Sequence, residues 1–166
     1  GMEKQWYLKD QKLESVWGNE KYGNTAGEGV VVAVIDTGVD YNHEDLQDNI
    51  WTNSAEVSGQ KGTDDDNNGY VDDVHGINLI DPNETPMDDH GHGTHVAGII
   101  AMENNNVGGV GIAYKSKIMP IKAGGSDGTL NSTDIAKAIV YAYKNGADVI
   151  NMSFGSYAHS ALIENA

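Results

Sequence analysis

Three histidines and two carboxylates lie within eight positions of the chain, at the start of the stretch DDHGHGTHVAG at residues 88–98. The small residues after the second histidine predict a helix that begins at His92. An imidazole in that place can act as a general base when a carboxylate holds one of its ring nitrogens and leaves the other free. Asp36 is the candidate for that carboxylate, because it follows an apolar run at residues 29–35. The sequence therefore predicts that Asp36 and His92 can face each other, which is the geometry that such a base needs.

The same histidines have a second chemical interpretation, which is a metal site. His90, His92 and His95 all carry imidazoles, and imidazole is a common ligand of zinc. Their spacings of two and three residues do not match the i, i+4 pair of a zinc-binding helix. We therefore expect His90 and His95 to be structural or solvated, with His95 hydrogen-bonded toward the interior.

Three segments predict strands, and the first, which has no polar alternation, is expected to be buried on both faces. They cover residues 29–35, 117–122 and 147–152. A helix is expected between the second and third, with Ser132 or Thr133 as its cap and a glycine stop after Lys144. A strand, a helix and a strand in this order form a parallel unit with a right-handed crossover.

These elements predict an α/β fold, doubly wound, with a mainly parallel sheet and helices on both faces. A short helix at residues 160–166 ends the sequence, so we expect the sheet to be truncated at its C-terminal side. Functional groups in such folds lie beyond the C-terminal ends of the strands, where Asp36 and Ser153 are placed.

The composition limits the number of domains and the class of partner. With 166 residues, of which 39% are hydrophobic, the chain is expected to form one domain over residues 1–166. Its net charge of −15 argues against nucleic acid and anionic membranes and favours cations. The absence of cysteine excludes disulfides and a cysteine nucleophile. No apolar window approaches the length of a membrane span.

An acidic insert near residues 60–76 has the spacing of a calcium loop. Oxygen donors recur at alternate positions, as in the first nine positions of an EF-hand loop. The glutamate expected at the twelfth position is absent, since His75 stands there, so we predict a calcium loop without the EF-hand helices. The alternative is a solvated acidic insert. The proposed ligands are Asp64, Asp66, Asn68, the Tyr70 carbonyl and Asp72.

Three segments together resemble the successive signatures of the subtilisin-like serine proteases: residues 32–40, 92–98 and 151–155. They occur in the order that is typical of this family, with Asp before His before Ser. The resemblance implies that Asp36 orients the imidazole and that His92 is the general base. It also implies an extracellular, calcium-stabilised endopeptidase.

The resemblance further implies a peptide-binding cleft between two segments, at which an extended substrate adds as a strand. One edge is formed by Gly128, Thr129 and Leu130, and the other by Ser153, Phe154 and Gly155. A second calcium loop is implied as well, with the family's N-terminal ligand expected before Gly1, so that the site is one ligand short. Its ligands are Asp45 and Asn105 through their side chains, and Glu103, Val107 and Gly109 through their carbonyls.

The sequence departs from the family pattern in one respect. The family's nucleophilic serine and oxyanion asparagine lie in segments that follow the last signature, and neither segment occurs here. We therefore expect the N-terminal portion of one peptidase domain, inactive alone. We also expect a homo-oligomer that buries residues 151–163 at an unpaired sheet edge.

Three other functions fit part of the sequence. The first is a non-catalytic module that binds calcium or a peptide. The second is an α/β-hydrolase in which Ser126, within a G-x-S-x-G pattern, is followed by Asp148 and His159. The third is a dimeric aspartic protease using Asp36, which would require an all-β fold and leave the histidine motif without a role.

Overall fold

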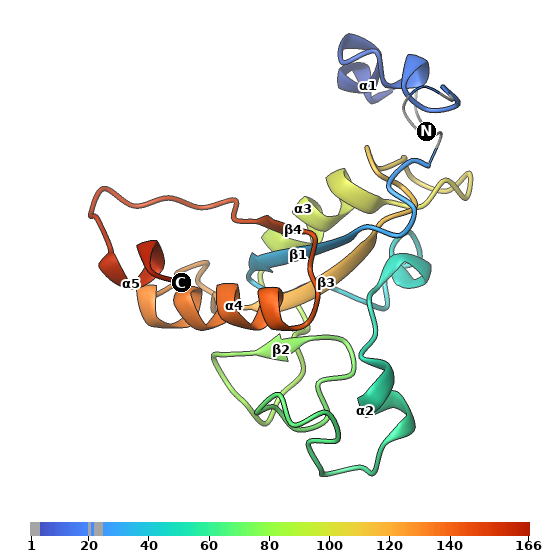
Figure 1. Ribbon diagram of the computed structural model, residues 1–166. Coiled ribbons are helices and arrows are strands. Elements are labelled where there is room, and N and C mark those ends of the chain that lie inside the picture. Colours follow the sequence, from blue (N-terminus) through green and yellow to red (C-terminus); the bar gives the residue numbers. More distant parts are fainter. Residues whose placement is uncertain (1–3, 20, 22–24) are drawn as a thin grey trace.

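A four-stranded parallel sheet lies at the centre of the chain (Figure 1). The computed structural model describes residues 4–19, 21 and 25–166. The strands stand in the order β2-β3-β1-β4. Their bounds are β1 Val31–Asp36, β2 Ile77–Asn78, β3 Lys117–Lys122 and β4 Val149–Asn151.

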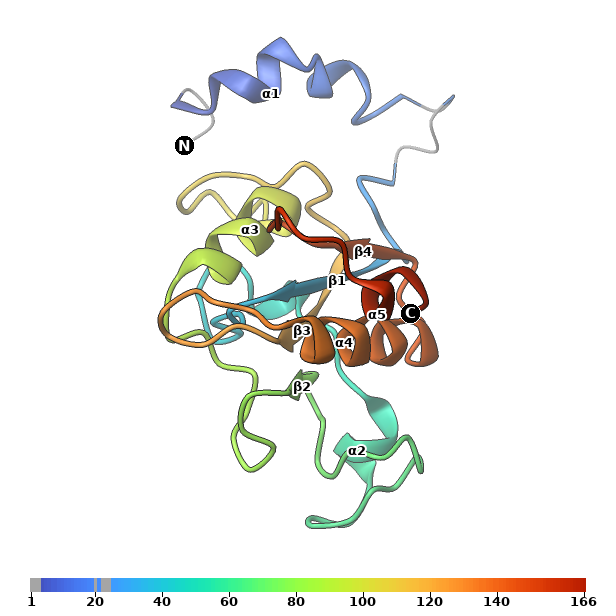
Figure 2. The same cartoon turned by 90° about the vertical axis from the view of Figure 1, so that its left-hand side faces the viewer.

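The helices are short except for two that cover the sheet. In both views α3 lies above β1 and α4 below it (Figures 1 and 2). Among the described residues, no helix is both long and apolar enough to cross a bilayer. The bounds are α1 Trp6–Asp10, η2 Leu13–Ser15, η4 Gln47–Asn49, α2 Ser54–Ser58, α3 His92–Ala101, α4 Ser132–Lys144 and α5 Ala161–Glu164.

The alternation of side chains along β1 explains why a helix packs on each face. Val32 and Val34 belong to the core cluster that contains Ala97 and Ala101 of α3. Ala33 and Ile35 belong to the other cluster, with Ala138, Tyr141 and Ala142 of α4. Successive residues of a strand point to opposite faces, so a strand without polar alternation needs apolar partners on both sides. The predicted doubly wound α/β fold with a parallel sheet is therefore confirmed.

The predicted bounds differ from the observed ones at the ends of elements. Asn131 caps α4, because its side chain accepts a hydrogen bond from the Asp134 amide, so the expected caps one or two residues later are wrong. The strand predicted at residues 147–152 is β4, and it begins only at Val149. The Asp148 side chain preceding it accepts the Val31 amide at 2.9 Å, which joins the starts of two strands.

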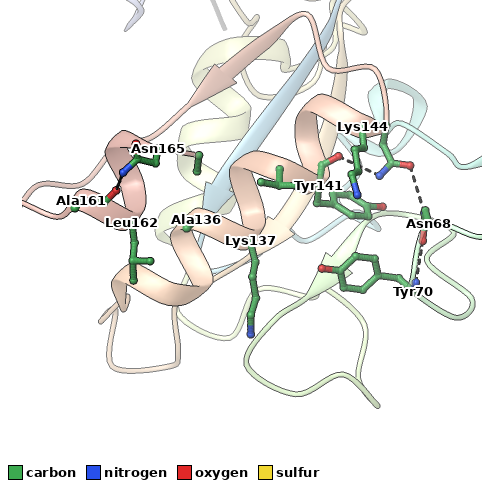
Figure 3. Close-up of a pocket in the computed structure, with 12 residues that line it drawn as sticks. Asn68, Tyr70, Ala136, Lys137, Tyr141, Lys144, Ala161, Leu162 and Asn165 are labelled. Atoms are coloured by element: carbon green, nitrogen blue, oxygen red, sulfur yellow. Dashed lines mark hydrogen bonds between the residues drawn. The ribbon is translucent and has the colours of Figure 1, made fainter.

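The acidic segment projects beyond β2, together with α2, at the lower end of Figure 2. Its buried anchor is Asp73, which accepts hydrogen bonds from Asn53, Asn68 and the hydroxyl of Tyr141. Burial raises the pKa of Asp73, and these donors partly offset that increase. Figure 3 shows Tyr141 facing Tyr70, and the two rings meet edge to face at 5.2 Å. The segment is thus fastened to α4.

The outer edge of β4 is the origin of our first prediction. Within the described chain, β4 pairs only with β1, and Val149 and Met152 are 49% and 42% exposed. An unpaired strand edge is a template for another chain. We expect a homodimer or larger assembly through this edge, measured by light scattering at tens of micromolar protein.

Two variants separate edge pairing from general apolar association. Val149→Lys places a charge on the edge and should give a monomer, because an edge lysine opposes strand pairing. Val57→Lys changes a valine on α2 that is 60% exposed and should leave the assembly unchanged. A monodisperse wild-type monomer would show that this expectation is wrong.

Candidate active site

The structure brings Asp36 and His92 together, although 56 positions separate them. Asp36 is the last residue of β1 and His92 the first of α3. The Nδ1 atom of His92 lies 2.7 Å from Oδ1 of Asp36. The aspartate side chain is 2% exposed and the imidazole 47% exposed. One partner is thus fixed in the interior, while the other reaches solvent.

The aspartate determines which ring nitrogen of His92 is available for chemistry. An ionised carboxylate can only accept hydrogen bonds, so Nδ1 must carry the proton that joins the two groups. In the neutral ring Nε2 is then an unprotonated acceptor. Oδ1 of Asp36 also accepts the Thr37 amide at 2.7 Å, which fixes the carboxylate plane. This arrangement can take a proton from a group placed beside Nε2.

Two glycines allow the helix start and the strand end to approach each other. A Cβ atom on Gly93 would lie 2.0 Å from the Gly38 carbonyl oxygen and 3.0 Å from Cβ of Asp36. Gly38 has a φ of +104°, a backbone conformation that residues with a Cβ atom rarely adopt. A Cβ there would lie 2.6 Å from the Pro86 carbonyl oxygen.

Asp88 organises the turn that leads into α3. Its carboxylate accepts the amides of His90, Gly91 and Thr94 at 2.9 to 3.0 Å. It also accepts the hydroxyls of Thr94 at 2.6 Å and Thr37 at 2.9 Å. Burial alone would raise the pKa of Asp88, but the hydrogen bonds from Thr94, Gly91 and His90 outweigh burial and lower it. The helix has no side-chain cap at Gly91, so Asp88 takes that role from outside the helix.

The other two histidines differ in their surroundings. The His90 ring centroid lies 6.4 Å from that of His92, and its Nε2 would be 3.0 Å from a Cβ on Gly128. His95 is exposed, and its imidazole forms no hydrogen bond with the described residues, so the expected inward bond of this side chain is wrong. No metal-ligating group of three among the described residues includes these histidines.

The two predicted substrate-binding segments face one cleft of about 750 Å³. Ser153 does not line it, and its hydroxyl accepts the side-chain amide of Asn151 at 2.9 Å. The predicted residues that do line the cleft are Gly128, Thr129, Leu130, Phe154 and Gly155.

Ser126 does not occupy the strand-to-helix elbow that an α/β-hydrolase requires. It lies in a turn closed by the Gly128 amide and the Gly125 carbonyl at 2.9 Å, and α4 begins only at Ser132. Asp148, the proposed acid of that alternative, accepts a backbone amide of β1 instead. The parallel α/β sheet likewise argues against the all-β fold of an aspartic protease.

Two predicted ligands of the acidic loop gather around a residue that the sequence analysis missed. Carboxylate oxygens of Glu56, Asp64 and Asp66 lie within 4.8 Å of one another. Glu56 is 5% exposed, although it lies in α2, well before the loop. Carboxylate oxygens are the ligands that calcium prefers, so the chemistry of this donor set fits that ion.

The other predicted ligands in this loop make contacts of their own. The Asn68 side-chain oxygen accepts the Tyr70 amide at 2.8 Å. The Asp72 carboxylate accepts the Gly62 amide at 2.9 Å and is not in the three-carboxylate group. These contacts hold Asn68 and Asp72 to the backbone of the acidic segment.

The second predicted loop encloses Asp45, which is 3% exposed. Its Oδ1 accepts the Asn105 side-chain amide at 3.3 Å, and its carbonyl accepts the Glu103 amide at 2.8 Å. The Asn105 oxygen accepts the Val107 amide at 2.9 Å. A Cβ on Gly108 would lie 2.1 Å from Oδ2 of Asp45, so the loop closes tightly on this carboxylate.

Gln5 adds a side-chain oxygen to this loop from the N-terminal segment. Its amide nitrogen donates to the Val110 carbonyl, and its oxygen accepts the Val110 amide, both at 2.9 Å. A Cβ on Gly109 would lie 2.8 Å from that oxygen. The side chain of Gln5 therefore joins the N-terminal segment to this loop.

Comparison with known proteins agrees with this geometry. Residues 27–165 match the family described as "Subtilase family". The chain is 45% identical over 136 residues to Subtilisin-like protease 1 of Plasmodium falciparum (isolate 3D7), covering 81% of this chain and 20% of that protein. It is 39% identical over 139 residues to the Thermophilic serine proteinase of Bacillus sp. (strain AK1), covering 83% and 29%. Subtilisin BL of Lederbergia lenta is 37% identical over 140 residues, covering 84% and 42%.

The relatives are longer than this chain. It spans about a fifth of the length of the Plasmodium protein and less than half of Subtilisin BL.

The close approach at Gly93 leads to our second prediction. Gly93→Ala should destabilise the chain by about 1–3 kcal/mol in urea unfolding, because the new methyl group meets backbone that cannot move aside. Gly98→Ala in the same helix is the control, since its nearest neighbour is the flexible end of Met102 at 3.3 Å. Equal stability of the two variants would contradict the proposed steric constraint.

Proposed function

Because this chain belongs to the subtilase family, we propose that it forms the part of a serine endopeptidase domain that carries the general base. The observation that carries this proposal is the 2.7 Å contact between a buried Asp36 and a half-exposed His92. Asp36 holds the imidazole with Nε2 toward solvent and would stabilise the imidazolium once the ring is protonated.

The proposed reaction gives His92 two roles in sequence. Nε2 first takes the proton of a serine hydroxyl as that oxygen attacks the scissile carbonyl carbon. The resulting imidazolium then returns the proton to the nitrogen of the leaving amine. Asp36 stays ionised throughout. The substrate is proposed to lie extended in the cleft between residues 128–130 and 154–155, and extracellular action is proposed from the family.

The serine must come from a segment that these 166 residues do not include. Ser153 is engaged with Asn151, and Ser126 lies in the turn before α4. We therefore propose that the chain alone does not hydrolyse peptides, and that the base finds its serine only in a longer protein.

Fluorophosphonate labelling tests both parts of this proposal. The 166-residue chain should show no stoichiometric labelling by mass spectrometry. A longer product of the same gene that includes a Gly-Thr-Ser segment should label, and His92→Ala should abolish the reaction because the serine then lacks its base. Labelling of the short chain that disappears in Ser126→Ala or Ser153→Ala would contradict the proposal.

Calcium is the proposed partner of the two oxygen-rich loops. The first loop would use Asp64, Asp66, Asn68, the Tyr70 carbonyl and Asp72, with Glu56 as an added ligand. The second would use Asp45 and Asn105, the carbonyls of Glu103, Val107 and Gly109, and the side chain of Gln5. A bound ion would neutralise carboxylates that otherwise repel one another, and so would stabilise both loops.

Thermal melting with calcium and with a chelator tests the two sites. Calcium at a hundredfold excess over its Kd stabilises a one-site protein by about 2.7 kcal/mol, so the melting temperature should rise clearly. Asp64→Asn combined with Asp66→Asn should remove part of the shift, and Asp45→Asn the rest. Asp81→Asn, an exposed carboxylate outside both loops, is the control. An unchanged melting temperature would contradict calcium binding.

A further inference from the structure

The Asp36–His92 contact joins the last residue of one element to the first residue of another. Asp36 ends β1 and His92 begins α3, and a small displacement of either would separate the two side chains. Hydrogen-bond geometry at 2.7 Å has little tolerance, because the interaction weakens steeply as distance and angle depart from their optimum. Other groups must therefore fix the position of the helix start relative to the strand end.

Thr37 lies at this junction and uses each of its polar atoms. Its amide donates to Asp36, and its carbonyl accepts the buried ammonium of Lys122 at 2.6 Å. Its hydroxyl accepts the Gly93 amide at 3.0 Å and donates to Oδ1 of Asp88 at 2.9 Å. The side chain is therefore a bridge from the strand end to the first turn of α3, and Thr37 is 2% exposed.

Asp88 holds the other end of that bridge. Oδ1 of Asp88 accepts the Thr37 hydroxyl and also the amides of His90 and Gly91, which lie in the turn just before α3. The second oxygen accepts the amide and hydroxyl of Thr94. The Thr94 hydroxyl in turn accepts the Asp40 amide at 2.9 Å, which returns the network to the segment after β1.

We propose that Asp88 and Thr37 are a positioning pair, which sets the separation of Asp36 and His92 through a carboxylate–hydroxyl bridge. Neither Asp88 nor Thr37 touches the reacting atoms. Both act by positioning Asp36 and His92. The role of this bridge in catalysis rests on the proposed function, whereas its effect on the Asp36–His92 distance concerns this chain alone. The lowered pKa of Asp88 comes from its hydrogen bonds with Thr94, Gly91 and His90, so the bridge to Thr37 rests on the geometry alone.

A simpler role for Asp88 would be to cap α3. The cap uses the amides at positions 90, 91 and 94, whereas the bridge uses the Thr37 hydroxyl, so the two roles can be separated. Thr37→Val removes the hydroxyl at nearly constant shape and leaves every cap bond of Asp88 in place. Thr37→Ser restores the hydroxyl. A cap alone predicts that all three residues at position 37 behave alike.

The test is the proton on Nδ1 of His92, observed by NMR in the nitrogen-15-labelled 166-residue chain and assigned with His92→Gln. A ring proton of this kind is visible only while a hydrogen bond protects it from exchange with water. We expect the signal in the wild type and in Thr37→Ser, and its loss in Thr37→Val and Asp88→Asn. Asp81→Asn removes an exposed carboxylate that accepts the Asn83 amide and should keep the signal.

Circular dichroism establishes that each variant is folded at the temperature of measurement. If Asp88→Asn does not fold, Thr37→Val decides alone. A signal that persists in folded Thr37→Val, with or without a lower melting temperature, overturns the proposal, as does its absence from the wild type. Fluorophosphonate chemistry plays no part in this measurement, so its outcome is independent of whether the longer protein is a peptidase.

Discussion

The hydrogen bond between the Asp36 carboxylate and the His92 imidazole is the constraint on which the rest of this structure depends. It requires a carboxylate that is buried and an imidazole that is not, and the two side chains come from different elements, β1 and α3. Strand β1 has neighbours on both sides, so its last residue is held inside the protein. Small side chains at Ala97 and Ala101 let α3 pack closely on that strand.

Each of the two oxygen-rich loops is connected to one of the helices on opposite faces of the sheet. Helix α3 carries His92 at its first residue and leads, after its last, into the loop around Asp45. The acidic segment is joined instead to α4 through the contact of Asp73 with Tyr141. Cations in these loops would therefore stabilise the framework around the base without touching it.

Sequence patterns predicted the parts that depend on local chemistry. The strand at residues 117–122, the end of α4 at Lys144 and the pairing of Asp36 with His92 are all observed as expected. These features follow from apolar runs, from a glycine stop and from the rule that functional groups lie beyond strand ends.

The parts that were missed depend on long-range packing. Gln5 reaches its loop from 105 positions away. Glu56 is near its loop in the sequence, but it lies in a helix outside the alternating pattern of oxygen donors, so the pattern does not mark it as a ligand. The two-residue strand β2 is too short to have a pattern, and it exists because Ile77 pairs with Ile121 of β3. His95 was expected inside because of its place in a helix, but the buried face of α3 belongs to Gly93, Ala97, Gly98 and Ala101.

A crystal structure of the 166-residue chain at high resolution tests the central claim most directly, because it measures the distance between Nδ1 of His92 and the nearer oxygen of Asp36. The account predicts a hydrogen bond close to 2.7 Å, formed by this chain without any further segment. Side chains separated beyond hydrogen-bonding distance, with α3 displaced from the end of β1, would contradict it.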